Sequence, residues 1–203
     1  MPVTAPANDP ADTSLRKQVY DSLREALTTG RFVPGQKVTF RFIAGALDVS
    51  LTPVREALRR LVAEGAFEMQ HNRSVRVPLM TRAKVLELRD IRIAVEGLAA
   101  GKAARLADRK QTQALRRIAR EVAAARSRGD NVTDRAKVRA FHFALYEIAG
   151  EPTLLRVIEG LWLQTGPYMN LLYPDFISSP RGPANARRTG TVARDAAGSP
   201  SGR

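Results

Sequence analysis

The chain contains no cysteine and only two histidines among its 203 residues. The absence of cysteine excludes disulfide bonds and metal sites built on thiolates. No apolar run approaches the length of roughly 20 residues that a membrane-spanning helix needs, and the N-terminus lacks the apolar core of a signal peptide. We therefore expect a cytoplasmic protein that does not bind membranes.

The sequence also lacks the residue groups that indicate catalysis. It has no nucleophile with a base and an orienting partner, no glycine-rich phosphate loop and no paired carboxylates. We therefore do not expect an enzyme.

Negative charge is scarce: 33 Lys and Arg residues stand against 20 Asp and Glu residues, a formal net charge of +13. Such an excess favours a polyanionic partner, nucleic acid first and an anionic membrane surface second. Residues 14–82 hold twelve basic and six acidic residues, and residues 105–139 hold eleven and four. The second block is interpreted as a solvated helix face, and the many arginines can also reflect coding bias.

Two short helices around a tight turn are the most informative pattern in the chain. Residues 40–48 end in Leu47-Asp48, and Ser50 is expected to cap a second helix by accepting from a first-turn amide. In that helix Val54, Leu58 and Leu61 recur at i, i+4 and i+7, which predicts one buried face. The opposite face is small and cationic, as in the recognition helix of a helix-turn-helix. An ordinary solvated helical hairpin is the alternative.

The next segment favours DNA binding. Phe67 and Met69, then Val75 and Val77, alternate with polar residues around a turn at residues 71–74. This pattern predicts a β-hairpin with a basic tip. A helix-turn-helix followed directly by a hairpin is a winged helix.

The residues of this region resemble a known family. Gly30-Arg31-Phe32-Val33-Pro34-Gly35, then Thr52-Pro53-Val54-Arg55-Glu56-Ala57-Leu58-Arg59-Arg60-Leu61 and Glu64-Gly65, are similar in order and spacing to the DNA-binding domain of GntR-type bacterial transcription regulators. The resemblance implies a sequence-specific regulator, a double-stranded DNA operator as partner and a homodimer. It also implies that Arg41, Ser50, Thr52, Arg55, His71 and Asn72 contact DNA. The cationic face of the second helix adds Arg59 as a candidate, and the basic tip of the hairpin adds Arg73. Leu51 and Ser74 depart from the family, which usually has Arg and Gly there.

The second half resembles the all-helical effector domain of the FadR-like branch of that family. Leu88 to Ala100 is similar to its first helix, and Phe141-His142-Phe143-Ala144-Leu145 to the helix that carries its first effector-site histidine. Apolar periodicity predicts helices at 81–107, 110–128, 133–149 and from Pro152 onward. The expected fold is mainly α: an N-terminal winged helix-turn-helix plus an incomplete C-terminal helical bundle. The expected domains are a disordered arm at 1–13, the DNA-binding domain at 14–80, the effector-binding and dimerisation domain at 81–177 and a disordered basic tail at 178–203.

The resemblance implies a small-molecule effector, often a carboxylate, and in many members a divalent metal. Here Val138 stands where those members have Asp, and the later histidines are absent, so we expect no metal or other cofactor. The expected effector-binding residues are Arg89, Arg92 and His142, because an arginine fork can bind a carboxylate with two hydrogen bonds. His142 can instead be a histidine satisfied within the core.

The family pattern ends near Pro180, after which Gly, Pro, Ser, Ala and Arg dominate. A natural linker or a frameshift that replaced the closing helices would explain this composition. We expect the effector bundle to leave apolar surface uncovered at 133–149 and 152–172. Two functions remain open: a regulator that responds to a metabolite, or a non-specific nucleic-acid-binding protein that has lost effector sensing.

Overall fold

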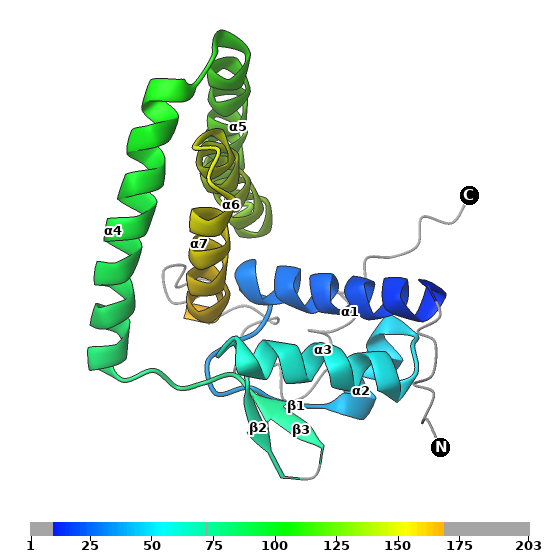
Figure 1. Cartoon of the computed structure of the whole chain (residues 1–203). Helices are drawn as coiled ribbons and strands as arrows, with labels where there is room; N and C mark the ends of the chain where they lie inside the picture. The colour runs from blue at the N-terminus through cyan, green and yellow to red at the C-terminus, as the bar shows by residue number, and fades with distance from the viewer. Residues whose placement is uncertain (1–9, 72, 169–203) are drawn as a thin grey trace, which may run out of the picture.

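A computed structural model of the chain describes residues 10–71 and 73–168 (Figure 1). Within these residues a small three-stranded sheet and three helices form the N-terminal half, and four helices form the C-terminal half. The elements are α1 (Pro10–Thr28), β1 (Lys37–Thr39), α2 (Phe40–Leu47), α3 (Leu51–Ala63), β2 (Glu68–Gln70), β3 (Ser74–Arg76), α4 (Arg82–Leu106), α5 (Arg109–Ser127), α6 (Asn131–Ile148) and α7 (Pro152–Thr165). None of these helices is both long and apolar enough to cross a membrane.

The helix-turn-helix is built as the sequence predicts, except at its second cap. The hydroxyl of Thr39 accepts from the backbone N–H of Phe42 and begins α2. Asp48 ends the helix in the left-handed region, with φ of 52°, and so turns the chain sharply into α3. Ser50 is the N-cap residue of α3, but its side chain makes no capping hydrogen bond, so that expectation is wrong.

The predicted hairpin is confirmed and has a third strand. β3 pairs with β2 on one side and with β1 on the other, so the strand order is β1-β3-β2. Val38 of β1 lies opposite Val75 of β3. The sequence does not predict β1, because three residues are too few to show alternation and their partner strand lies more than thirty positions away.

One hydrophobic core fills the winged helix. Val54, Leu58 and Leu61 are fully buried, which confirms the inward face predicted for α3. They pack with side chains of α1, of α2 and of the sheet. Leu163 of α7 belongs to the same core, although it is far along the chain in the other domain. The core of the DNA-binding domain is therefore completed by the effector domain.

The C-terminal helices have bounds close to those predicted. A reciprocal capping box between Asp108 and Gln111 begins α5, and Pro152 begins α7. The second core cluster joins α4, α6 and α7 and contains Ala99, Phe143, Tyr146, Ala149, Ile158 and Trp162. The fold is thus a winged helix joined to a helical domain, as expected.

The buried face of α4 differs from the predicted one. The apolar periodicity that predicts this helix includes Val85, Ile91 and Leu98, yet all three are exposed. The buried residues of α4 are Leu88, Ala99 and Ala103. Figure 1 shows α4 at one side of the molecule, where α6 and α7 approach it from one direction only. Small residues of α4 allow α6 and α7 to approach closely on that side. Much of the remaining apolar surface of α4 faces outward.

The expected apolar exposure on α7 is wrong for most of this helix. Ile158, Leu161, Trp162 and Leu163 are all buried, and Val157 is the exposed large apolar residue. The reason is that α7 packs against α1 of the DNA-binding domain as well as against α4. The analysis of the sequence could not include this contact because it joins two domains.

The two predicted disordered segments lie mostly outside the described residues, as does the expectation that the bundle is incomplete. The helix α1 begins at Pro10, four residues before the expected start at residue 14. Proline is favoured at the first position of a helix because its fixed φ suits the helix and its missing N–H would have no partner there.

We expect Leu163→Ala to lower the free energy of unfolding by about 2–5 kcal/mol, because it removes a fully buried leucine and leaves a cavity. Urea unfolding followed by circular dichroism measures this. Val157→Ala on the same helix is the control, since this side chain is 47% exposed and its loss should change the value by less than about 0.5 kcal/mol. Equal effects of the two substitutions would contradict the placement of Leu163 in the core.

Candidate DNA interface and effector pocket

Three arginines from three elements meet at a groove on the winged helix. The groove has a volume of about 320 Å³ and is lined by Thr39, Phe40, Arg41, Leu51, Arg55 and Arg73. Arg41 comes from α2, Arg55 from the first turns of α3, and Arg73 from the turn of the hairpin. The structure therefore brings together three of the predicted DNA-contacting side chains. Their combined positive charge suits a phosphate backbone that follows the groove.

The hairpin turn is tied to the start of α2. The carbonyl of Arg73 accepts from the backbone N–H of Phe40, at 3.1 Å. The hydroxyl of Ser74 donates to the carbonyl of His71, at 2.8 Å, and Ser74 is buried. Arg73 has a φ of 52°, a left-handed conformation that sharply reverses the chain. These contacts hold the basic tip beside the recognition helix.

The other predicted DNA-contacting residues do not line this groove. Ser50 and Thr52 are exposed at the start of α3, and His71 is exposed on the hairpin. Arg59 is exposed and forms an ion pair of 3.2 Å with Glu56, one turn earlier on the same helix. An exposed pair of this kind is weak, so DNA can compete for the guanidinium. Asn72 lies outside the described residues, and all eight assignments remain predictions.

A polar cluster at the far end of α3 holds the recognition helix on α1. The hydroxyl of Tyr20 donates to the carboxylate of Glu64, at 2.7 Å. Arg60 binds the same carboxylate at 2.9 Å and lies over the Tyr20 ring, 3.8 Å from its centre. Burial and the Glu64 carboxylate together raise the pKa of Tyr20 to about 12. Tyr20 therefore stays protonated as a donor, and the cluster ties α3 to α1.

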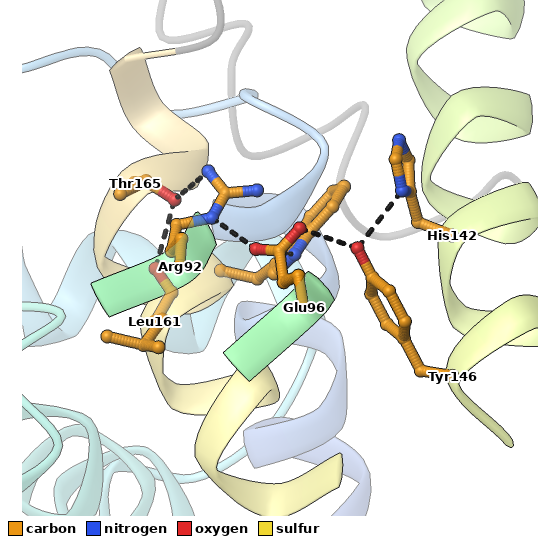
Figure 2. Close-up of polar contacts among 7 residues, drawn as sticks. Arg92, Glu96, His142, Tyr146, Leu161 and Thr165 are labelled. Atoms are coloured by element: carbon orange, nitrogen blue, oxygen red, sulfur yellow. Dashed lines mark hydrogen bonds and ion pairs between the residues drawn. The ribbon is translucent and has the colours of Figure 1, made fainter. Parts of the chain in front are cut away.

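In the second domain Glu96 is the centre of a network of hydrogen bonds (Figure 2). Its carboxylate accepts from Arg92 Nε at 2.5 Å, from the Tyr146 hydroxyl at 2.5 Å and from Trp162 Nε1 at 3.1 Å. Arg92 also donates to the hydroxyl of Thr165, at 3.1 Å. One carboxylate thus joins α4, α6 and α7.

Glu96, Trp162 and Thr165 are not among the site residues predicted from the sequence. A signal was present, because Arg92 and Glu96 are four residues apart and can pair along one helix face. Nothing in the sequence placed α7 beside them. That contact depends on tertiary packing.

A groove of about 310 Å³ lies beside this network. It is lined by Met80, Val85, Arg89, Arg92, Ile93, Glu96, Thr165 and Tyr168. Arg89 and Arg92 both line the groove, and Arg89 is paired with exposed Asp90 at 2.7 Å. Tyr168 is also in the lining. The groove therefore contains two of the three expected effector-binding residues.

His142 is separated from this groove. Its Nδ1 lies 3.0 Å from the Tyr146 hydroxyl, and Tyr146 in turn donates to Glu96 (Figure 2). Because the only hydroxyl proton of Tyr146 goes to Glu96, Nδ1 of His142 must carry the proton that it shares with Tyr146. Burial lowers the pKa of His142, against the opposing charge of Glu96. His142 therefore supports the network indirectly, through Tyr146.

The described residues contain no group of three or more side chains suited to hold a metal ion. Val138 lies four residues before His142, on the same helix. An apolar side chain at this position cannot coordinate a metal. The chemistry available around His142 is that of hydrogen bonding.

A winged helix with a basic groove, joined to a helical domain with a polar pocket, defines a class of DNA-binding transcription regulators. Two family models match this chain: "Bacterial regulatory proteins, gntR family" over residues 15–77, and "FCD domain" over residues 87–189. The chain belongs to the GntR family and carries the FCD type of effector domain. The resemblance inferred from the sequence is confirmed, and the family is one of DNA-binding regulators rather than enzymes.

Individual relatives agree with this assignment. The HTH-type transcriptional regulator McbR of Escherichia coli K12 is 31% identical over 160 residues, which is 79% of this chain and 72% of McbR. The solved structure of E. coli McbR/YncC has a TM-score of 0.76 at 26% identity and covers 90% of this chain and 91% of that one. A GntR regulator structure from Rhodococcus sp. RHA1, with a TM-score of 0.64 at 21% identity, covers 90% and 93% and shows the same fold.

We expect Arg55→Ala and Arg73→Ala to weaken DNA binding in different ways. If Arg55 contacts a base edge, its loss costs about 1–3 kcal/mol of preference for a selected duplex over random DNA. If Arg73 at the hairpin tip contacts phosphate, its loss weakens binding to both duplexes equally and lowers the slope of log affinity against log salt by about one. Fluorescence anisotropy at several salt concentrations measures both effects.

Arg105→Ala, at the distant end of α4, is the control for the change of one charge. It should leave the preference between the two duplexes unchanged. Wild-type preference in Arg55→Ala would show that α3 is not the recognition helix.

We expect the network around His142 to make stability depend on pH. Because burial lowers the pKa of His142, the unfolded chain binds its proton more readily than the folded chain. The contribution of neutral His142 to the free energy of unfolding is fully present above the ordinary histidine pKa of about 6.5. It is lost as the pH falls through the lower pKa of the folded state. His142→Gln should therefore flatten the fall in unfolding free energy over this range. His71→Gln is the matched control, and equal behaviour of both variants would refute the role of His142.

Proposed function

We propose that this chain is a dimeric, sequence-specific transcription regulator that acts in the cytoplasm, and that its FCD domain senses a small carboxylate. The observation that carries the proposal is the position of Arg92. Its guanidinium lines the groove beside α7 while Nε is held by Glu96 and Nη1 by Thr165. Within the described residues no hydrogen bond uses Nη2, which leaves this group for a ligand.

Arg89 supplies a second charge at the same groove. Its partner Asp90 is 65% exposed, and an exposed pair of neighbours contributes little stability. A ligand carboxylate can therefore replace Asp90 at small cost and lie between Arg89 and Arg92. Hydrogen bonds between charged groups are about twice as strong as neutral ones, which supplies selectivity for an anion.

The remaining lining suits a hydrocarbon part of the ligand. Met80, Val85 and Ile93 contribute apolar surface, and Ile93 is 66% exposed without a ligand. Covering such a side chain is favourable by about 25 cal/mol for each Å² removed from water. The groove therefore supports a small carboxylate with an apolar arm.

The outer face of α4 supports self-association. Ile91 and Leu98 are seven residues apart, lie on one side of the helix and are both exposed. A second copy could cover this stripe and place two recognition helices on one operator. Two-fold symmetric operators are the usual partners of such dimers.

A second function is favoured by one specific observation. Arg92 already has an internal carboxylate partner, and α5 exposes Arg109, Arg116, Arg117 and Arg120 away from the recognition helix. A protein that bound nucleic acid through general positive charge and no longer sensed a ligand would have these features. It would show little preference between a selected duplex and random DNA at physiological salt.

Benzoate and hexanoate, with benzamide and hexanamide as uncharged controls, test the proposed sensing. Trp162 is the only tryptophan and lies beside Arg92, so its fluorescence reports on the site. We expect the carboxylates, but not the amides, to change its emission and the affinity for a selected duplex. Arg92→Gln should weaken the carboxylate effect about tenfold, because it removes a charged donor.

Arg105→Gln on the same helix is the matched control and should respond like the wild type. No response of the wild type to either carboxylate up to millimolar concentration would refute a sensor for this ligand class. Equal affinity for selected and random DNA would favour the second function.

A further inference from the structure

The helix α7 contacts both functional parts of the molecule with neighbouring residues. Trp162 and Thr165 are three residues apart and face the Arg92–Glu96 network. Leu163 and Gly166 have the same spacing and face the DNA-binding domain. The groove lined by Arg89 and Arg92 (the effector groove) and the winged-helix core are therefore separated by the width of a single helix.

The contact at Gly166 joins backbone to backbone. A Cβ atom on this residue would lie 2.3 Å from the carbonyl oxygen of Leu27 and 2.7 Å from the Cα of Thr28. Both distances are far below van der Waals contact, so only glycine lets α7 approach α1 this closely. No layer of flexible side chains separates the two helices here. A displacement of this end of α7 must therefore displace the end of α1.

Three polar contacts surround the joint that Gly166 forms with the end of α1. Arg24 of α1 binds Glu159 of α7 at 2.8 Å, and both side chains are about three-quarters buried. Arg135 of α6 donates to the carbonyl of Thr29 at 3.3 Å. Gln164 donates to the carbonyl of Glu64, at the end of the recognition helix, at 3.4 Å. The contacts reach both α1 and α3.

Tyr168 connects the same joint to the linker between the domains. Its hydroxyl donates to the carbonyl of Pro78 at 3.0 Å and accepts from the backbone N–H of Met80 at 2.5 Å. Met80 and Tyr168 also line the effector groove. The covalent linker and the end of α7 are thus bound to each other beside the groove, and neither can move alone.

We propose that α7 couples the Arg92–Glu96–Trp162 network to the DNA-binding domain, and that Gly166 is the residue that positions this coupling. A ligand that draws Arg92 away from Glu96 and Thr165 shifts α7, and the close contact at Gly166 transmits the shift to α1 and α3. The proposal rests on the proposed function only for the nature of the ligand. Because coupling between two sites is reciprocal, binding of DNA must alter the surroundings of Trp162.

Trp162 allows the effect of DNA binding on the effector domain to be measured without any effector. The side chain is 5% exposed and lies in the effector domain, so DNA does not touch it. A duplex selected from a random pool is added to the full chain, and Trp162 emission and DNA anisotropy are recorded together. We expect the emission to change with the same midpoint as DNA binding. An emission that stays constant while DNA binds would overturn the proposal.

Gly166→Ala should separate the two signals: DNA still binds, and the change in Trp162 emission is lost. Gly160→Ala is the matched control, because a Cβ atom there meets nothing within 4 Å and the wild-type change should persist. Should Gly166→Ala fail to fold, Arg24→Gln weakens the same joint and should at least halve the emission change. If Gly166→Ala folds and its Trp162 emission still responds to DNA as in the wild type, the role of the joint is refuted. If Gly166→Ala does not fold, a wild-type response of Arg24→Gln refutes it.

The two proposals fail differently. A response of Trp162 to DNA but not to benzoate or hexanoate leaves the coupling intact and removes carboxylate sensing. A response to the carboxylates but not to DNA leaves the sensing site intact and refutes the coupling.

Discussion

The carboxylate of Glu96 holds the effector domain together. It accepts from Arg92, Tyr146 and Trp162, which come from α4, α6 and α7. The helix α4 buries only one large apolar side chain, Leu88, so packing alone gives it little attachment. A largely buried carboxylate without donors would be costly, whereas with three donors it joins the helices in one arrangement. The position of α4, and with it the groove that Arg89 and Arg92 line, depends on this group.

Local patterns in the sequence predicted much of the fold. The spacing of Val54, Leu58 and Leu61 defined the inward face of α3, and alternation defined the hairpin. The four later helices follow from their apolar periodicity and from breaks such as Gly129 and Pro152. These features are local, because helix faces, caps and turns depend on residues only a few positions apart.

What the sequence did not predict depends on contacts between distant segments. The strand β1 gains its structure from β3, and Ile91 and Leu98 are exposed because no described helix covers the outer side of α4. Of the candidate site residues, Arg89 and Arg92 meet at one groove, but His142 reaches them only through Tyr146 and Glu96. Residue type suggested each candidate, and only the packing of α7 determined which of them share a site.

The place of Leu163 has a consequence for how such regulators can be recombined. Two domains joined by a short linker are commonly regarded as interchangeable parts, with a boundary near residue 80. Here the core of the first domain takes a side chain from the last described helix of the second. A chimaera that combined this winged helix with another effector domain would open that core unless the new helix supplied a matching leucine and glycine.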